Sequence, residues 1–278
     1  MLDVLKSIIL GIIEGITEWL PISSTGHLKL AGNLLAFESV SEGFPQMFDY
    51  VVQLGAILAV VVMFWNKLWP FTSKEKGFVK RKSIMIWFKV IVAMLPAAIA
   101  GILLDDWVEG LLVDPKIEAT VISATLILYG IAFIVIENIN TNRKSKIISV
   151  KALTYKDALL IGLFQVLSII PGTSRSGSTI LGAIILGVSR TVAAEFSFFL
   201  AVPVIFGASL LKILKFGFSF TGTEFVILAV GMVTAFIISI LAIKFLLGYI
   251  KKKDFKAFGY YRIVLGLLVL GYFWLLTK

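Results

Sequence analysis

Two polar stretches rich in glycine, proline and serine interrupt segments that are otherwise apolar enough for a membrane. The first runs from Glu14 to His27 (EGITEWLPISSTGH), and the second from Pro171 to Thr179 (PGTSRSGST). In hydrocarbon an unpaired backbone group is costly, and a central charged side chain costs about 2.5–3.5 kcal/mol on insertion scales, so such stretches persist only inside protein or beside a wet cavity. They therefore mark where function is expected. The simpler alternative is a pair of loops at the membrane surface.

The composition is that of a polytopic membrane protein. Hydrophobic residues make up 59% of the 278 residues and charged residues 15%, whereas soluble domains carry about 25% charged residues. The formal charge of +9 does not predict a nucleic-acid partner, because the basic residues fall in short connections between apolar runs. The absence of cysteine excludes disulfides and thiolate chemistry. The first ten residues have no basic region and no small-residue cleavage site, so we expect no removable signal peptide.

Apolar runs predict six membrane-crossing helices, each near the length of about 20 residues that a crossing needs. Two further apolar stretches, 4–36 and 156–187, are divided near their centres by the polar stretches, and the halves are too short to cross singly. We predict that they form two re-entrant helix–loop–helix hairpins in an all-α, single-domain membrane protein over 1–278. The six predicted crossings are 46–65, 84–104, 117–137, 192–214, 225–248 and 259–276.

The charges of the connections between the predicted helices predict on which side of the membrane each connection lies. Segments 66–83, 138–157 and 249–262 are rich in lysine and arginine and are expected in the cytoplasm, whereas segment 105–116 has four acidic residues and one lysine and is expected outside. Both chain ends are then expected outside as well. The basic residues concerned are Lys67, Lys74, Lys76, Lys80, Arg81, Lys82, Arg143, Lys144, Lys146, Lys151, Lys156, Lys251, Lys252, Lys253, Lys256 and Arg262.

The number of crossings between the two hairpins predicts an inverted repeat. Three crossings, an odd number, separate the hairpins, so one enters the membrane from each side and their tips meet near its middle. The first repeat covers about 1–140 and the second about 150–278. Direct similarity between the repeats is weak, so this prediction depends on the topology.

The first polar stretch carries two acids on one helical face. Glu14 and Glu18 are four residues apart, which places their Cβ atoms about 5–6 Å apart in a helix. Their repulsion at low dielectric must be relieved by a shared proton, by a basic side chain, or by a divalent cation that takes oxygen ligands. A metal would leave open positions for phosphate oxygens. The alternative is that both glutamates snorkel to the membrane interface.

The same stretch continues with three hydroxyls and the only histidine of the chain. Ser23, Ser24 and Thr25 precede Gly26 and His27. A serine or imidazole nucleophile needs a base and an orienting group within hydrogen-bond reach, and this stretch contains each type. The alternatives are helix capping by a single hydroxyl and interhelical hydrogen bonding by the histidine.

The second polar stretch predicts an anion site. Arg175 lies between Ser174 and Ser176, and Gly177 and Thr179 follow as a helix begins. Free N–H groups at a helix start, adjacent hydroxyls and a guanidinium together favour phosphate. The alternative is that the arginine pairs with one of the two glutamates for neutrality, and the two roles are compatible.

The two stretches together resemble the signature regions of a known family. EGITE (14–18), PISSTGH (21–27) and PGTSRSG (171–177) are similar to the motifs of the bacterial undecaprenyl-diphosphate phosphatases of the bacitracin-resistance family. The likeness extends to FDYVVQLG (48–55) and SFFLAVP (197–203). It runs essentially from end to end of the chain.

The resemblance implies a function and a set of site residues. It implies hydrolysis of undecaprenyl diphosphate to the monophosphate, bacitracin resistance, and a bacterial cytoplasmic-membrane location with a site reached from the extracytoplasmic side. The family's acidic motif falls on Glu14 and Glu18, its serine on Ser24, its histidine on His27 and its phosphate-binding arginine on Arg175.

A mechanistic hypothesis follows. Ser24 or His27 attacks the terminal phosphorus or activates water to do so, Glu14 and Glu18 hold Mg²⁺ or Ca²⁺ or tune the base, and Arg175 neutralises the phosphate oxygens. Membrane lipids surround the chain, and formation of a homodimer is left open. The competing classes are a secondary transporter or lipid flippase and a non-catalytic lipid-binding protein. The expected substrate-binding residues are Ser23, Thr25, Ser174, Ser176, Gly177 and Thr179.

Overall fold

The regular structure of the chain is helical. The computed structural model describes residues 2–71, 80–141, 143–217 and 220–276, so the predicted loop residues Lys74 and Lys76 lie outside it. Within the described residues the β-pairing is an isolated bridge between Ile147 and Val188. The helices are α1 (Leu2–Thr17), α2 (Ser24–Leu34), α3 (Phe44–Met63), α4 (Trp65–Leu68), α5 (Arg81–Leu111), α6 (Pro115–Asn140), η1 (Val150–Ala152), α7 (Tyr155–Val166), η2 (Leu167–Ile169), α8 (Arg175–Ile185), α9 (Arg190–Phe216), α10 (Gly222–Ile250), α11 (Lys256–Gly271) and η3 (Tyr272–Leu276).

Six helices in the described part of the chain are long and apolar enough to cross a membrane: α3, α5, α6, α9, α10 and α11. They coincide with the six predicted runs, which confirms the all-α polytopic class. In α5 the candidate span is Arg81–Leu104, which agrees with the predicted end at 104, and the helix itself continues beyond the span to Leu111. The acids that follow residue 104 end the apolar run, but the segment DDWVE contains no proline or glycine to end a helix.

The two divided stretches fold as two pairs of short helices. A first turn (residues 18–23) joins α1 to α2, and a second turn (residues 170–174) joins α7 and η2 to α8. Both α2 and α8 have 11 residues, well short of the about 20 needed to cross a bilayer. The division of each stretch by its polar segment is as predicted. Entry into a membrane from opposite sides stays a prediction.

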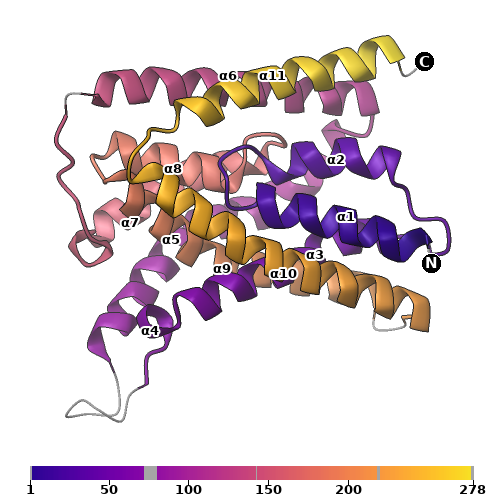
Figure 1. The fold of residues 1–278 in the computed structure, drawn as a ribbon, viewed down its shortest axis with the longest axis horizontal. Coiled ribbons are helices and arrows are strands. Elements are labelled where there is room, and N and C mark those ends of the chain that lie inside the picture. Colours follow the sequence, from indigo (N-terminus) through magenta and orange to yellow (C-terminus); the bar gives the residue numbers. More distant parts are fainter. Residues whose placement is uncertain (1, 72–79, 142, 218–219, 277–278) are drawn as a thin grey trace.

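The two helix pairs pack in corresponding ways in the two halves of the chain. In the first pair α1 lies along α10, and in the second α7 lies along α5 (Figure 1). Both contacts use a glycine for close backbone approach. A Cβ added at Gly11 would lie 2.6 Å from the carbonyl oxygen of Gly231, and one added at Gly162 would lie 2.1 Å from that of Ala93. A side chain at either glycine would therefore force the helices apart.

The predicted cytoplasmic connections gather at one end of the molecule. In Figure 1 the connections from α6 to α7 and from α10 to α11 lie at the left, and both chain ends lie at the right with the α5–α6 connection. Two cavities of about 650 Å³ and 710 Å³ lie at the basic end, and neither is lined by Glu18 or Arg175. The grouping of the connections agrees with the predicted sidedness, although which end faces the cytoplasm stays a prediction.

Candidate active site

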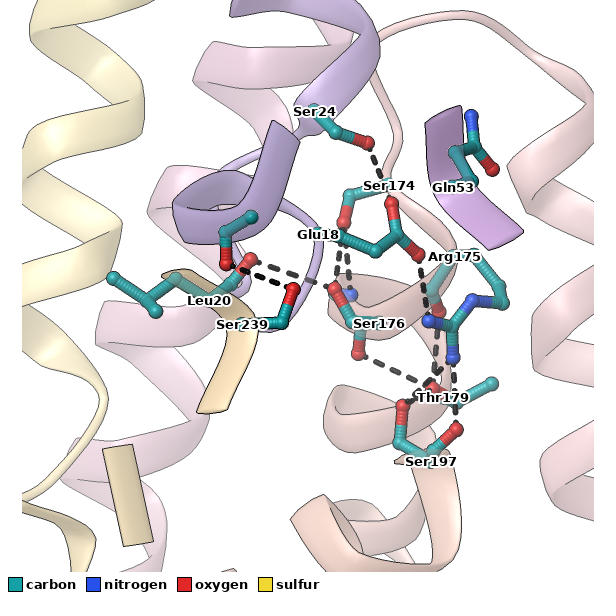
Figure 2. A network of polar contacts seen from close by, with 12 residues as sticks. Glu18, Leu20, Ser24, Gln53, Ser174, Arg175, Ser176, Thr179, Ser197 and Ser239 are labelled. Atoms are coloured by element: carbon teal, nitrogen blue, oxygen red, sulfur yellow. Dashed lines mark hydrogen bonds and ion pairs between the residues drawn. The ribbon is translucent and has the colours of Figure 1, made fainter. Parts of the chain in front are cut away.

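The first and second turns meet through an ion pair between the two predicted site residues of opposite charge. Nη2 of Arg175 donates to Oε1 of Glu18 at 2.7 Å (Figure 2). Both side chains are largely buried, with 11% and 7% of their surface exposed. The neighbouring Trp19 is fully buried and packs edge-on against Phe198, which anchors the first turn. The Glu18 carboxylate and the Arg175 guanidinium, 157 residues apart in sequence, therefore belong to one site.

Both turns lead into their helices through the same backbone conformation, a capping serine with a positive φ angle. Ser23 and Ser174 have φ angles of 73° and 71°, and they are the non-glycine residues with positive φ in the described part of the chain. Each caps its helix, because its hydroxyl accepts from the backbone N–H of the glycine three residues on, Gly26 or Gly177. Such a conformation costs of order 1–3 kcal/mol and is concentrated at functional sites. The predicted binding hydroxyls of these two serines thus serve as caps.

Ser24 is the hydroxyl that contacts the acid. Its O–H donates to Oε2 of Glu18 at 2.8 Å, so that the Glu18 carboxylate accepts from Ser24 and Arg175 at once. The side chain of Ser24 is half-buried, whereas the neighbouring Thr25 is exposed. A carboxylate that accepts the hydroxyl proton is the arrangement that general-base activation of a serine requires.

Ser197 of α9 joins the site, and sequence reasoning did not assign it a role. Nη1 of Arg175 donates to the Ser197 carbonyl oxygen at 2.8 Å and to its hydroxyl at 3.3 Å, and that hydroxyl lies 2.7 Å from the hydroxyl of Thr179. The Arg175 Nε is buried and has no hydrogen-bond partner among the described residues. These contacts hold the guanidinium over the start of α8, and they leave the Nε–H for a ligand.

Ser176 lies between the two turns. Its hydroxyl is 3.1 Å from that of Ser174 and donates to the carbonyl oxygen of Leu20 at 3.5 Å, a long contact across to the first turn. The side chain is 2% exposed. Ser176 therefore joins the same network as the ion pair (Figure 2).

Glu14 is fully buried, and its carboxyl group makes no hydrogen bond to the described residues. The side chain lies within electrostatic reach of two acids, Glu18 and Asp49, and of the Arg175 guanidinium. No group of three or more His, Cys, Asp or Glu residues suited to a metal occurs in the described ranges. Two orphaned oxygens beside a second carboxylate nevertheless suit a divalent cation that takes oxygen ligands and completes its shell with water or phosphate.

The His27 side chain makes its contacts away from the Glu18–Arg175 ion pair. Its Nδ1 lies 2.7 Å from the Ser23 carbonyl oxygen and its Nε2 lies 2.7 Å from the hydroxyl of Tyr261, whose ring stacks on the imidazole. Because a carbonyl only accepts, Nδ1 carries the proton, and in the neutral ring Nε2 accepts from the tyrosine. Both ring nitrogens are thus engaged outside the Ser24–Glu18–Arg175 network.

Arg262 corrects one expectation from the sequence. The charge pattern places it in a cytoplasmic basic connection, but it lies in α11 and is 0% exposed. Its guanidinium donates to the carbonyl oxygens of Pro21, Gly172 and Thr173, at 3.2, 2.8 and 2.9 Å. The basic connection in fact ends before α11 begins at Lys256, and a run of loop charges does not reveal where the next helix starts.

The comparisons with known proteins agree with the motifs over nearly the whole chain. The family model of the bacitracin resistance protein BacA matches residues 7–268. The undecaprenyl-diphosphatase of Lachnoclostridium phytofermentans is 58% identical over 272 residues, covering 98% of this chain and 97% of that protein. An undecaprenyl-diphosphatase of Enterococcus faecalis is 57% identical, covering 97% and 96%, and that of Acetivibrio thermocellus is 55% identical, covering 98% of each. This chain therefore belongs to the bacitracin resistance protein BacA family.

Proposed function

We propose that this protein hydrolyses undecaprenyl diphosphate to undecaprenyl monophosphate and inorganic phosphate. Relatives that are 55–58% identical to this chain over nearly their full length are named for this activity. The observation that carries the proposal is the Ser24–Glu18–Arg175 network, in which a hydroxyl, a base and a phosphate-binding cation meet. Phosphoryl transfer depends mainly on positioning and charge stabilisation, and this network supplies both.

In the proposed reaction Ser24 is the nucleophile and Glu18 is the base. The Ser24 oxygen bonds to the terminal phosphorus while its proton moves to Glu18, and the bond from that phosphorus to the bridging oxygen breaks. Undecaprenyl monophosphate leaves with the bonding electron pair and takes up the proton from Glu18, which is then an ionised carboxylate again. Water then attacks the phosphoserine, gives one proton to the serine oxygen, and releases inorganic phosphate. The 2.8 Å contact between Ser24 and Glu18 supports this assignment over His27, whose nitrogens bond elsewhere.

Arg175 binds the phosphoryl group that is transferred. Its Nε–H has no partner among the described residues, and its Nη2 can exchange Glu18 for a phosphate oxygen when substrate arrives. That exchange would also free Glu18 to take the serine proton. The free N–H groups at the starts of α2 and α8 add positive potential at the same place.

Glu14 and Glu18 are the proposed ligands of Mg²⁺ or Ca²⁺. The orphaned oxygens of Glu14 support this role. A divalent cation would supply charge neutralisation for the diphosphate. Independently of a metal, Glu18 accepts a hydrogen bond from the hydroxyl that reacts.

The proposed setting is the bacterial cytoplasmic membrane, with the site reached from the extracytoplasmic side. Helix surfaces with large exposed apolar side chains, such as Ile102 and Leu103 of α5, suit contact with lipid. The polar turns suit the diphosphate, and the isoprenyl chain would lie among the helices. Recycling of the lipid carrier by this reaction would confer bacitracin resistance.

Phosphate release by purified protein in detergent tests the proposal against a transporter or flippase. A short-chain isoprenyl diphosphate serves as substrate, with and without EDTA, and no gradient can exist in detergent. We expect release that falls on chelation of the metal. Intact substrate together with saturable lipid binding would refute the phosphatase and favour a lipid-binding or transport protein.

A further inference from the structure

Arg262 contacts both turns of the active site from a third helix. One nitrogen, Nη1, donates to the Pro21 carbonyl oxygen of the first turn, and the other, Nη2, donates to Gly172 and Thr173 of the second turn. The side chain is 0% exposed. A single guanidinium thus joins the two loops that carry Ser24 and Arg175 at their ends.

The charge of Arg262 is not neutralised by a carboxylate within the described ranges. Its remaining contact is the ring of Tyr129, whose centroid lies 5.3 Å from the guanidinium carbon. A buried arginine inside a membrane protein is costly, and such residues mark functional sites by default. A neutral donor or an apolar side chain would be the cheaper way to link two loops, so the cation itself needs an explanation.

We propose that Arg262 is a positioning residue of the phosphatase site, an inference that rests on the function proposed above. The planar fork of the guanidinium fixes the separation of the two turns, and thereby the distance from the Ser24 hydroxyl at the start of α2 to the Arg175 guanidinium at the start of α8. Its charge, which no carboxylate of the described residues pairs with, also adds positive potential at both turns, where the diphosphate would bind.

Gly177 leaves room for this fork. A Cβ added there would lie 2.9 Å from Nη1 of Arg262 and 3.3 Å from Cβ of Ser174. Gly177, which the sequence analysis placed among the expected substrate-binding residues, therefore also permits close approach of the Arg262 side chain. A lysine at position 262 would keep the charge, but its single nitrogen lacks the rigid fork that holds two carbonyl groups at once.

The test compares two variants of Arg262 with a matched control. Arg262→Lys keeps the charge and Arg262→Gln removes it, and kcat and KM for phosphate release are measured in detergent. Lys89 is the control residue, because it is also buried and donates to backbone carbonyl oxygens, those of Val150 and Lys151, away from the two turns. We expect kcat to fall by about 10²-fold in folded Arg262→Lys while KM changes little, because misplacement of reacting groups acts on the chemical step. Lys89→Met should keep the wild-type kcat per folded molecule.

Hydrogen–deuterium exchange provides a second readout that needs no activity. Arg262→Lys should exchange faster than wild type in both turns, 18–23 and 170–174, whereas Lys89→Met should change only the segment around 150–151. A folded Arg262→Lys protein with wild-type kcat and wild-type exchange in the turns would overturn the inference. If the wild type itself releases no phosphate, the proposed function fails, while the exchange result still decides whether Arg262 fixes the turns.

Discussion

The residue that follows the capping serine differs after the two turns: it is Ser24 at the start of α2, after the first turn, and Arg175 at the start of α8, after the second. The surrounding backbone is nearly the same, with a positive-φ serine, a helix of 11 residues and a glycine N–H bonded to the cap in each case. The same backbone conformation thus places the Ser24 hydroxyl beside Glu18 after one turn and the Arg175 guanidinium after the other. The comparison teaches that the site divides its chemistry between two similar halves.

The same division appears one helix earlier. Glu14 in α1 and Gln165 in α7 each follow, by three residues, the glycine that packs against a long helix, and both are 0% exposed with side-chain atoms lacking partners in the described part of the chain. One is a potential carboxylate and the other a neutral amide. The first half therefore gathers negative charge, and the second half gathers the cation that meets it.

Removal of the hydroxyl from the first turn should have the largest effect. Ser24→Ala removes the proposed nucleophile, and we expect kcat to fall by about 10³-fold or more, as for other covalent catalysts. The matched control is Ser209→Ala, which removes a buried hydroxyl of α9 that donates to the Tyr50 carbonyl oxygen instead. Phosphate release measures both variants. Near-normal turnover of Ser24→Ala would exclude the serine as the attacking group.

The second largest effect is expected for Arg175, the cation that follows the second turn. Arg175→Ala should lower kcat/KM by about 10²–10³-fold, the range found when one preorganised charge stabiliser is lost, and Arg175→Lys should recover only part of it because bidentate contact is lost. The exposed Arg143 is the control, and Arg143→Ala should behave as wild type. Equal activity of the lysine variant and the wild type would show that point charge suffices and that the fork contributes nothing.

Replacing Glu14 with the neutral amide that the second half has at the corresponding position tests whether Glu14 is a ligand of the proposed divalent cation. Glu14→Gln places at position 14 the side chain that position 165 already has, and we expect the divalent-cation concentration for half-maximal activity to rise by about 10-fold or more. A titration of activity against Mg²⁺ and Ca²⁺ measures it, with Gln165→Asn as the matched change in the other half. An unchanged cation dependence would remove Glu14 from the proposed ligand set.

The smallest of these effects should come from His27. Its contacts with Ser23 and Tyr261 support the start of α2 rather than the reacting groups, so His27→Gln should cost about one neutral hydrogen bond, roughly 0.5–1.5 kcal/mol. That corresponds to a loss of no more than about 10-fold in kcat. Tyr261→Phe, which removes the partner hydroxyl, should match it. A loss as large as that of Ser24→Ala would return the histidine to the list of nucleophiles.

Features encoded by local sequence patterns were predicted from the sequence. Hydrophobic length identified the six crossing helices, and polar residues inside apolar runs identified the two turns that meet at Glu18 and Arg175. It could not predict that Arg262 leaves the basic connection for the interior, because loop charge and buried charge look alike in one dimension. Nor could it predict that the Ser24 side chain contacts Glu18 whereas the His27 side chain contacts Ser23 and Tyr261, since these contacts depend on the three-dimensional fold.

A double-mutant cycle across the two turns tests the central claim that they form one catalytic unit. Phosphate release is measured for wild type, Glu18→Gln, Arg175→Gln and the double variant, each checked for folding. We expect the double variant to lose far less than the product of the two single losses, with a coupling of about 0.5–3 kcal/mol, as for residues in direct contact. Losses that simply multiply would contradict a shared site and would leave the two turns as separate features of the fold.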